Sequence, residues 1–264
     1  DLIIKKKINH VFISINDPDK KTYFKTLTKF KKKNIITKVG VLKLKTKKFY
    51  ESYFVNRVNG TPFVTAKLAL SKDFFTINKK KEWITNKYSR GRVHLMRSKH
   101  DVILSSYKTV MSDNSHLTCR INGLEKFSPT RIILDKNFKI SPKCNLIKSA
   151  KNFKKIIFIK NKKNYKKLSL FKKLKVKVIY TKTDVNGNFV LKNILEKIND
   201  LGYSRIFLES GISLISNFLK NGLINDFFIF FSNNKLNNNG DGNFKKIHKK
   251  YLKLKKNIKE NVNL

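Results

Sequence analysis

The chain has 264 residues, of which 60 are Lys or Arg and 17 are Asp or Glu, so its formal net charge is +43. Hydrophobic residues make up 40% of the chain and aromatic residues 12%, which excludes global disorder because such a chain can bury a core. No apolar run approaches the roughly 18 residues of a membrane span, so the pattern gives no reason to expect membrane association.

The first quarter of the chain predicts two short strands and two helices. The strands are expected at residues 9–15 and 35–39, and the helices at residues 21–33 and 43–57. Asn59, Gly60, Thr61 and Pro62 then form a turn-rich linker. We therefore predict a domain boundary here, with one domain at residues 1–59 and a second at residues 60–264.

The second domain alternates strand and helix patterns. Strands are expected at residues 63–70, 101–106, 130–135, 156–160, 175–180, 204–208 and 226–231, and helices at residues 86–98, 162–173, 190–201 and 212–221. Nearly continuous apolar runs such as residues 131–135 and 205–209 are typical of strands that are covered on both faces. The pattern predicts an α/β domain with a mostly parallel sheet flanked by helices. An Asn- and Gly-rich loop at residues 233–243 and a Lys-rich tail are expected to follow.

Nucleic-acid binding is one function class that the charge suggests. Phosphate and base readers favour Arg because of its bidentate fork, yet seven of the basic residues are Arg and the rest are Lys spread along the whole chain. We interpret the Lys excess as solvated surface and keep a basic nucleic-acid-binding protein as the alternative. Such a field also suits a small anionic substrate.

Residues 205–222 carry a strand, a tight turn and a helix start. Glu209 falls at the carboxyl end of the strand, where open α/β sheets bind ligands. Gly211 would let the backbone approach a ligand, and the free N–H groups of the following helix attract an anion such as a nucleotide phosphate. The alternative is an ordinary strand–helix turn in which Ser210 and Gly211 serve only for capping.

Three basic residues are candidates for the same site. Lys67 lies inside an apolar strand, where a charge is unfavourable unless it is paired or faces a cleft; the alternative is a side chain that reaches solvent near the strand end. Arg97 ends a helix for which Thr85 is the expected N-cap, and Arg120 closes the polar loop at residues 107–120. In a chain that prefers Lys, such Arg residues suggest bidentate binding of a phosphate or carboxylate, or else a local ion pair.

The remaining reactive side chains predict no metal site. Cys119 and Cys144 stand alone, and the five His residues lack the spacing of zinc ligands. Free thiols are expected in a reducing cytoplasm. Because residue 1 is Asp and no leader pattern follows it, we expect the sequence to be a fragment or an incomplete reading frame.

Seven segments in order resemble the reductase domain of the bifunctional deaminase/reductase family of riboflavin biosynthesis. They are residues 63–73 (FVTAKLALSKD), 83–85 (WIT), 95–98 (LMRS), 101–104 (DVIL), 109–120 (TVMSDNSHLTCR), 129–135 (PTRIILD) and 209–211 (ESG). Their order and spacing match the family from about residue 62 to about residue 231. Residues 1–59 resemble the end of the family's cytidine-deaminase-like domain, with residues 11–18 (VFISINDP) as its late strand and turn.

The resemblance implies a dihydrofolate-reductase-like fold, a homodimer and an NADPH-dependent reaction. The implied reaction reduces the ribosyl group of 5-amino-6-(5-phosphoribosylamino)uracil to a ribityl chain, through an imine carbon that accepts hydride. A same-fold reductase acting on another pyrimidine or pteridine substrate stays open beside it. No nucleic-acid partner is implied.

The resemblance also implies roles for individual residues. Lys67 and Glu209 would form the catalytic polar pair nearest the reacting sugar. The substrate-binding positions are Arg97, Leu117, Arg120, Glu209 and Lys81, with Arg97 and Arg120 on the phosphate. The NADPH-binding positions are Ala69, Trp83, Thr109, Asp113, Lys136, Gly211, Ile212, Ser213, Leu214, Ile215, Ser216 and Asn217.

The sequence departs from the family at several points. Lys72 and Phe74 replace usual loop residues, two residues are missing before Trp83, and Lys81 stands where the family has a substrate-binding Ser. Ser210 replaces the usual middle Gly of the 209–211 turn. The last family strand is expected beyond residue 264. The zinc motifs of the deaminase are absent, so the resemblance assigns zinc and deamination to a part of the parent protein outside this chain.

Overall fold

The computed structural model describes residues 2–19, 21–22, 25–149, 152–160 and 164–248, which fall into two compact units. One unit contains residues 1–63 and 195–204, and the other contains residues 64–194 and 205–264. The first segment ends next to the expected linker at residues 59–62. The parts of the Lys-rich tail that follow residue 248 lie outside the described residues.

The first unit contains a small parallel β-α-β arrangement. Its elements in chain order are α1 (Leu2–Lys5), β1 (His10–Ile13), α2 (Lys25–Lys32), β2 (Ile36–Val39), α3 (Lys43–Phe49) and α4 (Glu51–Asn59). β1 and β2 pair in parallel. The helix expected at residues 43–57 is two helices divided at Tyr50. α4 ends because Gly60 adopts a left-handed conformation with φ of 66° and donates its N–H to Asn56. The deaminase-like origin of this segment stays a prediction.

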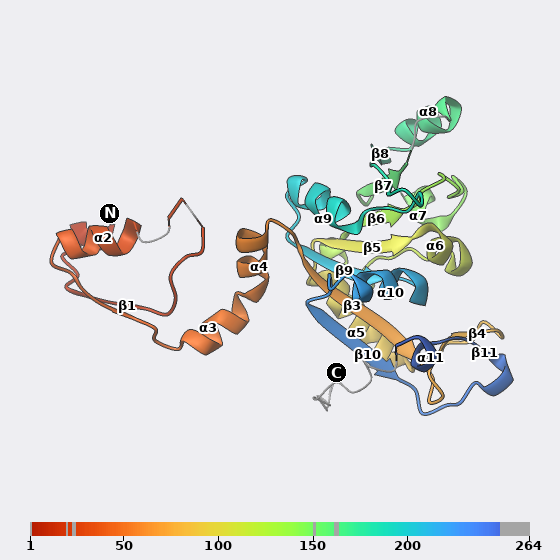
Figure 1. Cartoon of the computed structure of the whole chain (residues 1–264), viewed down its shortest axis with the longest axis horizontal. Helices are drawn as coiled ribbons and strands as arrows, with labels where there is room; N and C mark the ends of the chain where they lie inside the picture. The colour runs from red at the N-terminus through yellow and green to blue at the C-terminus, as the bar shows by residue number, and fades with distance from the viewer. Residues whose placement is uncertain (1, 20, 23–24, 150–151, 161–163, 249–264) are drawn as a thin grey trace. The chain divides into compact units, whose positions relative to one another are not determined.

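The second unit is built on a seven-stranded sheet of order β10-β3-β9-β5-β6-β7-β8 (Figure 1). The strands are β3 (Phe63–Leu70), β5 (Val102–Ser106), β6 (Thr130–Leu134), β7 (Lys155–Ile159), β8 (Lys177–Tyr180), β9 (Arg205–Glu209) and β10 (Asp226–Phe231). Parallel pairing joins β10 to β3, β9 to β5, and β5 through β6 and β7 to β8. The predicted mostly parallel sheet is confirmed.

Helices and short elements connect these strands. In chain order they are β4 (Phe75–Asn78), α5 (Lys87–Ser98), α6 (Tyr107–Asp113), η1 (Glu125–Phe127), α7 (Asn145–Lys148), α8 (Tyr165–Lys173), α9 (Leu191–Asp200), α10 (Ile212–Lys220), η3 (Asn237–Asn239), β11 (Gly240–Asn243) and α11 (Phe244–His248). The polar loop expected at residues 107–120 begins with α6, and the loop expected at residues 233–243 contains β11. α6 and β11 are too short to produce a clear hydrophobic period.

Both faces of the sheet are buried, as the continuous apolar runs predict. One face packs Ile103, Ile133, Ile157 and Phe207 with Val93 and Met96 of α5, Val110 of α6 and Phe171 of α8. The alternate strand residues, such as Leu104, Ile132 and Leu208, are also fully buried. α10 contributes buried Ile215, Phe218 and Leu219. The core therefore holds the strand ends rigidly, and these ends carry the polar residues considered below.

A network of hydrogen bonds centres on Asp73, in the turn after β3. Its carboxylate accepts from the N–H groups of Leu236 and Asn237 and from the Ser71 hydroxyl. β4 and β11 pair in antiparallel fashion beside it. Burial raises the pKa of Asp73, but these hydrogen bonds outweigh it and bring the pKa down to about 2. This network connects the segments at residues 71–78 and 235–243 to each other.

Candidate functional site

Charged residues meet at the carboxyl ends of two neighbouring strands. β3 and β9 lie side by side in the sheet, so Lys67 on β3 and Glu209 at the end of β9 are brought to the same region. α5 contributes Arg97 and His94, and α6 ends at Asp113. The carboxyl edge of a parallel sheet is where such folds bind ligands.

Arg97 and Glu209 form a bidentate ion pair. The Arg97 Nε and Nη2 atoms donate to the two Glu209 carboxylate oxygens, each at 2.9 Å. Arg97 is 8% exposed, and its Nη1 donates to the Thr118 carbonyl at 2.9 Å. Burial raises the pKa of Glu209, but the charge and hydrogen bonds of Arg97 outweigh burial and leave this pKa below its ordinary value. Glu209 is therefore held as a carboxylate in a fixed orientation.

This geometry bears on two predictions. Lys67 and Glu209 lie in one cluster and their charges act on each other, but the Glu209 carboxylate pairs with Arg97, and the Lys67 ammonium makes no ion pair within 4.0 Å among the described residues. Arg97, predicted to hold the substrate phosphate, donates here to Glu209 and to the Thr118 carbonyl, and its role toward a phosphate stays a prediction. The physical reason is that a guanidinium fork matches a carboxylate better than an ammonium does.

Lys67 is the cation left without a direct acceptor in this cluster. Its Nζ lies 5.8 Å from the centre of the Phe230 ring and has no hydrogen bond to another described residue. Burial lowers the pKa of Lys67, Glu209 and Asp113 raise it, and Arg97 lowers it, with a net lowering. An amine in this position gives up a proton more readily than an ordinary lysine.

His94 joins the cluster and was not predicted from the sequence. Its Nδ1 lies 3.1 Å from the Thr118 carbonyl and accepts from the Arg120 N–H at 3.1 Å, and its Nε2 lies 3.3 Å from Arg120 Nη2. Burial, followed by the charges of Arg97 and Arg120, lowers the pKa of His94 to about 4. His94 is therefore neutral near pH 7. Its spacing of three residues from Arg97 was the available signal, because helix residues three apart share a face.

A hydroxyl network connects the ends of β5 and β9. Thr109 Oγ1 lies 3.0 Å from Ser106 Oγ and 3.1 Å from Ser210 Oγ, and it accepts from the Gly211 N–H at 3.1 Å. Ser210, which replaces the family's Gly, takes part through its buried hydroxyl. Gly211 has φ of −67°, so its backbone conformation does not require glycine, and its predicted role of letting the backbone approach a ligand stays a prediction.

The start of α10 has the geometry expected of an anion site. Gly211 is the N-cap and makes no side-chain capping bond, so the N–H groups of Ile212, Ser213 and Leu214 have no helical acceptor. Ser213 and Asn217 are exposed, whereas Ile215 and Ser216 are buried. An uncapped helix start beside the Glu209 turn fits the pyrophosphate of a dinucleotide.

The other predicted residues are not part of the Arg97–Glu209 ion pair. Asp113 is exposed, and its charge acts on both Lys67 and Glu209. Leu117 is buried with φ of 53°. Ala69 lies on β3 two residues beyond Lys67, opposite Phe230. Lys136 donates from Nζ to Asn188 at 3.3 Å, and Lys81 is exposed with φ of 61°.

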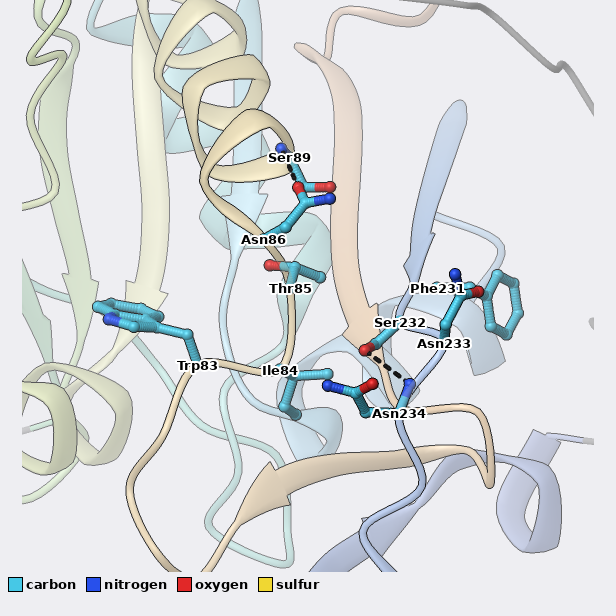
Figure 2. Close-up of a pocket in the computed structure, with 9 residues that line it drawn as sticks. All are labelled: Trp83, Ile84, Thr85, Asn86, Ser89, Phe231, Ser232, Asn233 and Asn234. Carbon is cyan, nitrogen blue, oxygen red and sulfur yellow. Dashed lines mark hydrogen bonds between the residues drawn. The ribbon is translucent and has the colours of Figure 1, made fainter.

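A cavity of about 300 Å³ opens at the amino end of α5 (Figure 2). Its lining comes from the segment before and at the start of α5 and from the end of β10: Trp83, Ile84, Thr85, Asn86, Ser89, Phe231, Ser232, Asn233 and Asn234. The Arg90 guanidinium lies 5.1 Å from the Trp83 ring centre and donates to the Thr85 carbonyl. The predicted N-cap at Thr85 is wrong by one residue, because Asn86 accepts from the Ser89 N–H.

Two further features are absent from the described residues. No group of three or more His, Cys, Asp or Glu side chains there has the arrangement of a metal site. In the same residues, no helix has both the length and the apolar character needed to cross a membrane.

Comparisons with known proteins identify relatives of the chain. The family model described as "RibD C-terminal domain" matches residues 62–236. The riboflavin biosynthesis protein RibD of Aquifex aeolicus is 29% identical over 234 residues, covering 88% of this chain and 63% of that protein. RibD of Bacillus amyloliquefaciens is 27% identical, covering 88% of this chain and 62% of that protein.

Solved structures give the same result. A diaminohydroxyphosphoribosylaminopyrimidine deaminase/5-amino-6-(5-phosphoribosylamino)uracil reductase from Thermotoga maritima is 27% identical with a TM-score of 0.75, covering 89% of this chain and 63% of that chain. Acinetobacter baumannii RibD, at 19% identity and a TM-score of 0.78, shows the shared fold. The chain spans less than two thirds of the length of each of these relatives.

Proposed function

The chain belongs to the RibD C-terminal domain family, and from this membership we propose that it reduces the ribosyl group of 5-amino-6-(5-phosphoribosylamino)uracil to a ribityl chain with NADPH. The observation that carries the proposal is the Lys67, Glu209 and Arg97 cluster at the carboxyl ends of β3 and β9. It combines an oriented carboxylate with an amine that has no direct partner. A carboxylate can accept a hydrogen bond from a sugar hydroxyl, and a protonated amine can donate a proton to a reducible imine.

NADPH fits the residues at the edge of the sheet. The uncapped start of α10 supplies N–H groups for a pyrophosphate, and Thr109 fixes the turn before it. Lys136, after β6, is proposed to meet the 2′-phosphate. When bound, NADPH supplies the hydride that the reduction consumes.

The cluster then acts on the opened sugar. Glu209 remains ionised because of Arg97, so it accepts hydrogen bonds from ribose hydroxyls and does not donate a proton. Lys67, with its lowered pKa, is the better proton donor. Lys67 would transfer its ammonium proton to the imine nitrogen, and together with a hydride on the imine carbon this gives a secondary amine. Arg120 is exposed and retains free donors, so we assign the substrate phosphate to it in place of Arg97.

A reduction assay with the purified chain tests this proposal. NADPH consumption should match formation of the ribityl product, and NADH should be a poorer donor. Arg120→Ala should raise the Michaelis constant for the phosphorylated substrate at least ten-fold, corresponding to about 1.5–3 kcal/mol for a charge-assisted contact. The dephosphorylated analogue should be indifferent to this change. Absence of any NADPH consumption by the folded chain would overturn the proposal.

The assembly and location of the chain follow as further proposals. We expect a homodimer in the cytoplasm, as the family resemblance implies. Sedimentation equilibrium of the purified chain tests the first expectation, and a mass equal to one chain at all concentrations would contradict it.

A further inference from the structure

The cavity at the amino end of α5 differs from the rest of the surface in its charge. All nine lining residues are neutral, although 60 of the 264 residues of the chain are Lys or Arg. No cation lines the cavity, and the Ser89 N–H at this helix start already donates to the Asn86 side chain, so neither of the usual phosphate-binding groups is offered here. This lining therefore favours a neutral ligand and disfavours the phosphate or pyrophosphate ends of the two reactants.

The cavity also presents hydrogen-bonding groups without partners. Thr85 is 9% exposed, and its hydroxyl has no hydrogen bond to another described residue. The side chains of Ser89, Asn233 and Asn234 likewise have no partner among the described residues, while the backbone of Asn234 is fixed by Ser232 and Lys72. An amide offers both a donor and an acceptor. Side-chain donors and acceptors along the lining of one cavity suit a planar heterocycle with alternating C=O and N–H groups.

The position of the cavity relates it to the charged cluster. Ser232, in the lining, donates its N–H to the Leu70 carbonyl at the end of β3 at 2.7 Å. Leu70 is three residues beyond Lys67 on the same strand, a distance of about 10 Å along a strand. α5 runs between the two places, with Ser89 in its first turn and Arg97 in its last. One extended substrate can therefore place its sugar at Lys67 and its base in the cavity.

We propose that the cavity lined by residues 83–89 and 231–234 binds the uracil ring of the substrate, with Asn233, Asn234 and Thr85 recognising its polar edge. This inference rests on the proposed function and adds the specificity-determining residues for the base. The volume of about 300 Å³ lies at the small end of ligand sites, which suits a single ring. Figure 2 draws the Asn234 amide beside the Ile84 side chain, so the ring would meet a polar and an apolar group together.

The sole tryptophan of the chain provides a direct test. Trp83 lines the cavity, so its fluorescence reports on occupancy. We expect 5,6-diaminouracil, which lacks sugar and phosphate, to change the Trp83 emission, and ribose 5-phosphate not to. Thr85→Val and the double variant Asn233→Ala/Asn234→Ala should each weaken 5,6-diaminouracil binding at least ten-fold. Asn238→Ala is the matched control, because that asparagine lies in the same loop outside the lining.

The outcomes separate this inference from the proposed function. Melting curves and NADPH affinity of the variants should equal those of the parent chain. If the parent reduces phosphoribosylaminouracil but both cavity variants keep its Michaelis constant and their affinity for 5,6-diaminouracil, the inference is overturned and the function stands. If 5,6-diaminouracil binds and the variants lose it while the parent shows no reduction, the base site stands and the function fails.

Discussion

Buried cations occupy two opposite edges of the same sheet in different ways. At the carboxyl edge, Arg97 is paired with the Glu209 carboxylate, and Lys67 is near it. At the amino edge, Arg131 on β6 and Lys155 on β7 are direct neighbours in the register of the two strands. Arg131 is 0% exposed and Lys155 is 2% exposed, yet neither forms an ion pair with a carboxylate in the described part of the chain.

The amino edge stabilises its cations with neutral groups. Arg131 donates to the carbonyls of His116, Ser149 and Phe153 and lies 5.1 Å from the Phe153 ring centre, while its Nε has no partner. Burial lowers the pKa of Arg131 to about 10. Burial, and then the charge of Arg131, lowers the pKa of Lys155 to about 7. The comparison indicates that a buried cation alone does not mark a site; we propose the site at the carboxyl edge because an oriented carboxylate accompanies the cations there.

The largest expected effect comes from breaking the ion pair at the carboxyl edge. Arg97→Met leaves the Glu209 carboxylate with only the unpaired, nearby charge of Lys67, and removing one partner of a buried ion pair destabilises a protein by about 3–5 kcal/mol. Urea unfolding should measure a loss of this size. Adding Glu209→Gln should recover part of it, since the uncompensated charge is then removed. Equal stability of the single and double variants would contradict the pairing.

At the amino edge, Arg131→Met should cost less stability and little function. The variant leaves three carbonyls without their donor, but it also removes an unpaired buried charge, so we expect a net loss of about 2 kcal/mol. NADPH affinity and turnover at low temperature should be unchanged, because the hydrogen bonds of Arg131 go to His116, Ser149 and Phe153, none of which is assigned to the reaction. A large fall in turnover by a fully folded variant would break the comparison.

Lys155 should make stability depend on pH. Its pKa is about 7 in the folded chain and 10.5 ordinarily, so the unfolded chain binds more protons between these values and stability rises with pH across this window. Below about pH 7 Lys155 is protonated in both the folded and the unfolded chain, so the destabilisation caused by burying its charge no longer changes with pH. Lys155→Met should therefore be more stable than the parent at about pH 6, by roughly 1–2 kcal/mol. The advantage should shrink toward pH 10, and an advantage that is constant across this range would count against the assigned cause.

The smallest effect is expected at Lys136, a partly exposed cation at the proposed cofactor site. Lys136→Ala should weaken NADPH binding by about five-fold, or roughly 1 kcal/mol, and leave NADH binding unchanged. Fluorescence titration with both cofactors measures this difference. Lys139→Ala serves as the control, since Lys139 is an exposed lysine of the same segment. Equal losses of affinity for NADPH and NADH would contradict only the assignment of Lys136 to the 2′-phosphate.

The sequence predicted the sheet better than it predicted the contacts at the site. The apolar runs that became β3 and β10 have the predicted bounds, because a continuous apolar run is a clear strand signal, both in the buried β3 and in the partly exposed edge strand β10. α6, β4 and β11 were missed, since elements of four to seven residues have no resolvable period. The break at Tyr50 between α3 and α4 was missed as well.

At the site, the neighbourhood of Lys67 and Glu209 could be predicted from strand order, but the partner of Glu209 could not. Arg97 reaches Glu209 from α5, 112 positions away in sequence, and only the packing of the helix on the sheet determines that contact. The same holds for Asn233 and Asn234, which the sequence presents as ordinary loop residues. Arg131 looks no less functional than Arg97 in the sequence, and only its surroundings distinguish the two.

The most direct test of the central claim is single-turnover hydride transfer from NADPH to phosphoribosylaminouracil in Glu209→Gln. We expect a rate at least about 100-fold below that of the parent chain, because the neutral amide no longer orients the ribose hydroxyls as the carboxylate does, with nearly unchanged NADPH affinity. The variant should stay folded at the assay temperature, so that a fall in its melting temperature does not explain the loss of activity. A stable Glu209→Gln variant that transfers hydride at the parent rate would contradict the claim that the carboxyl edge of β3 and β9 carries the reaction.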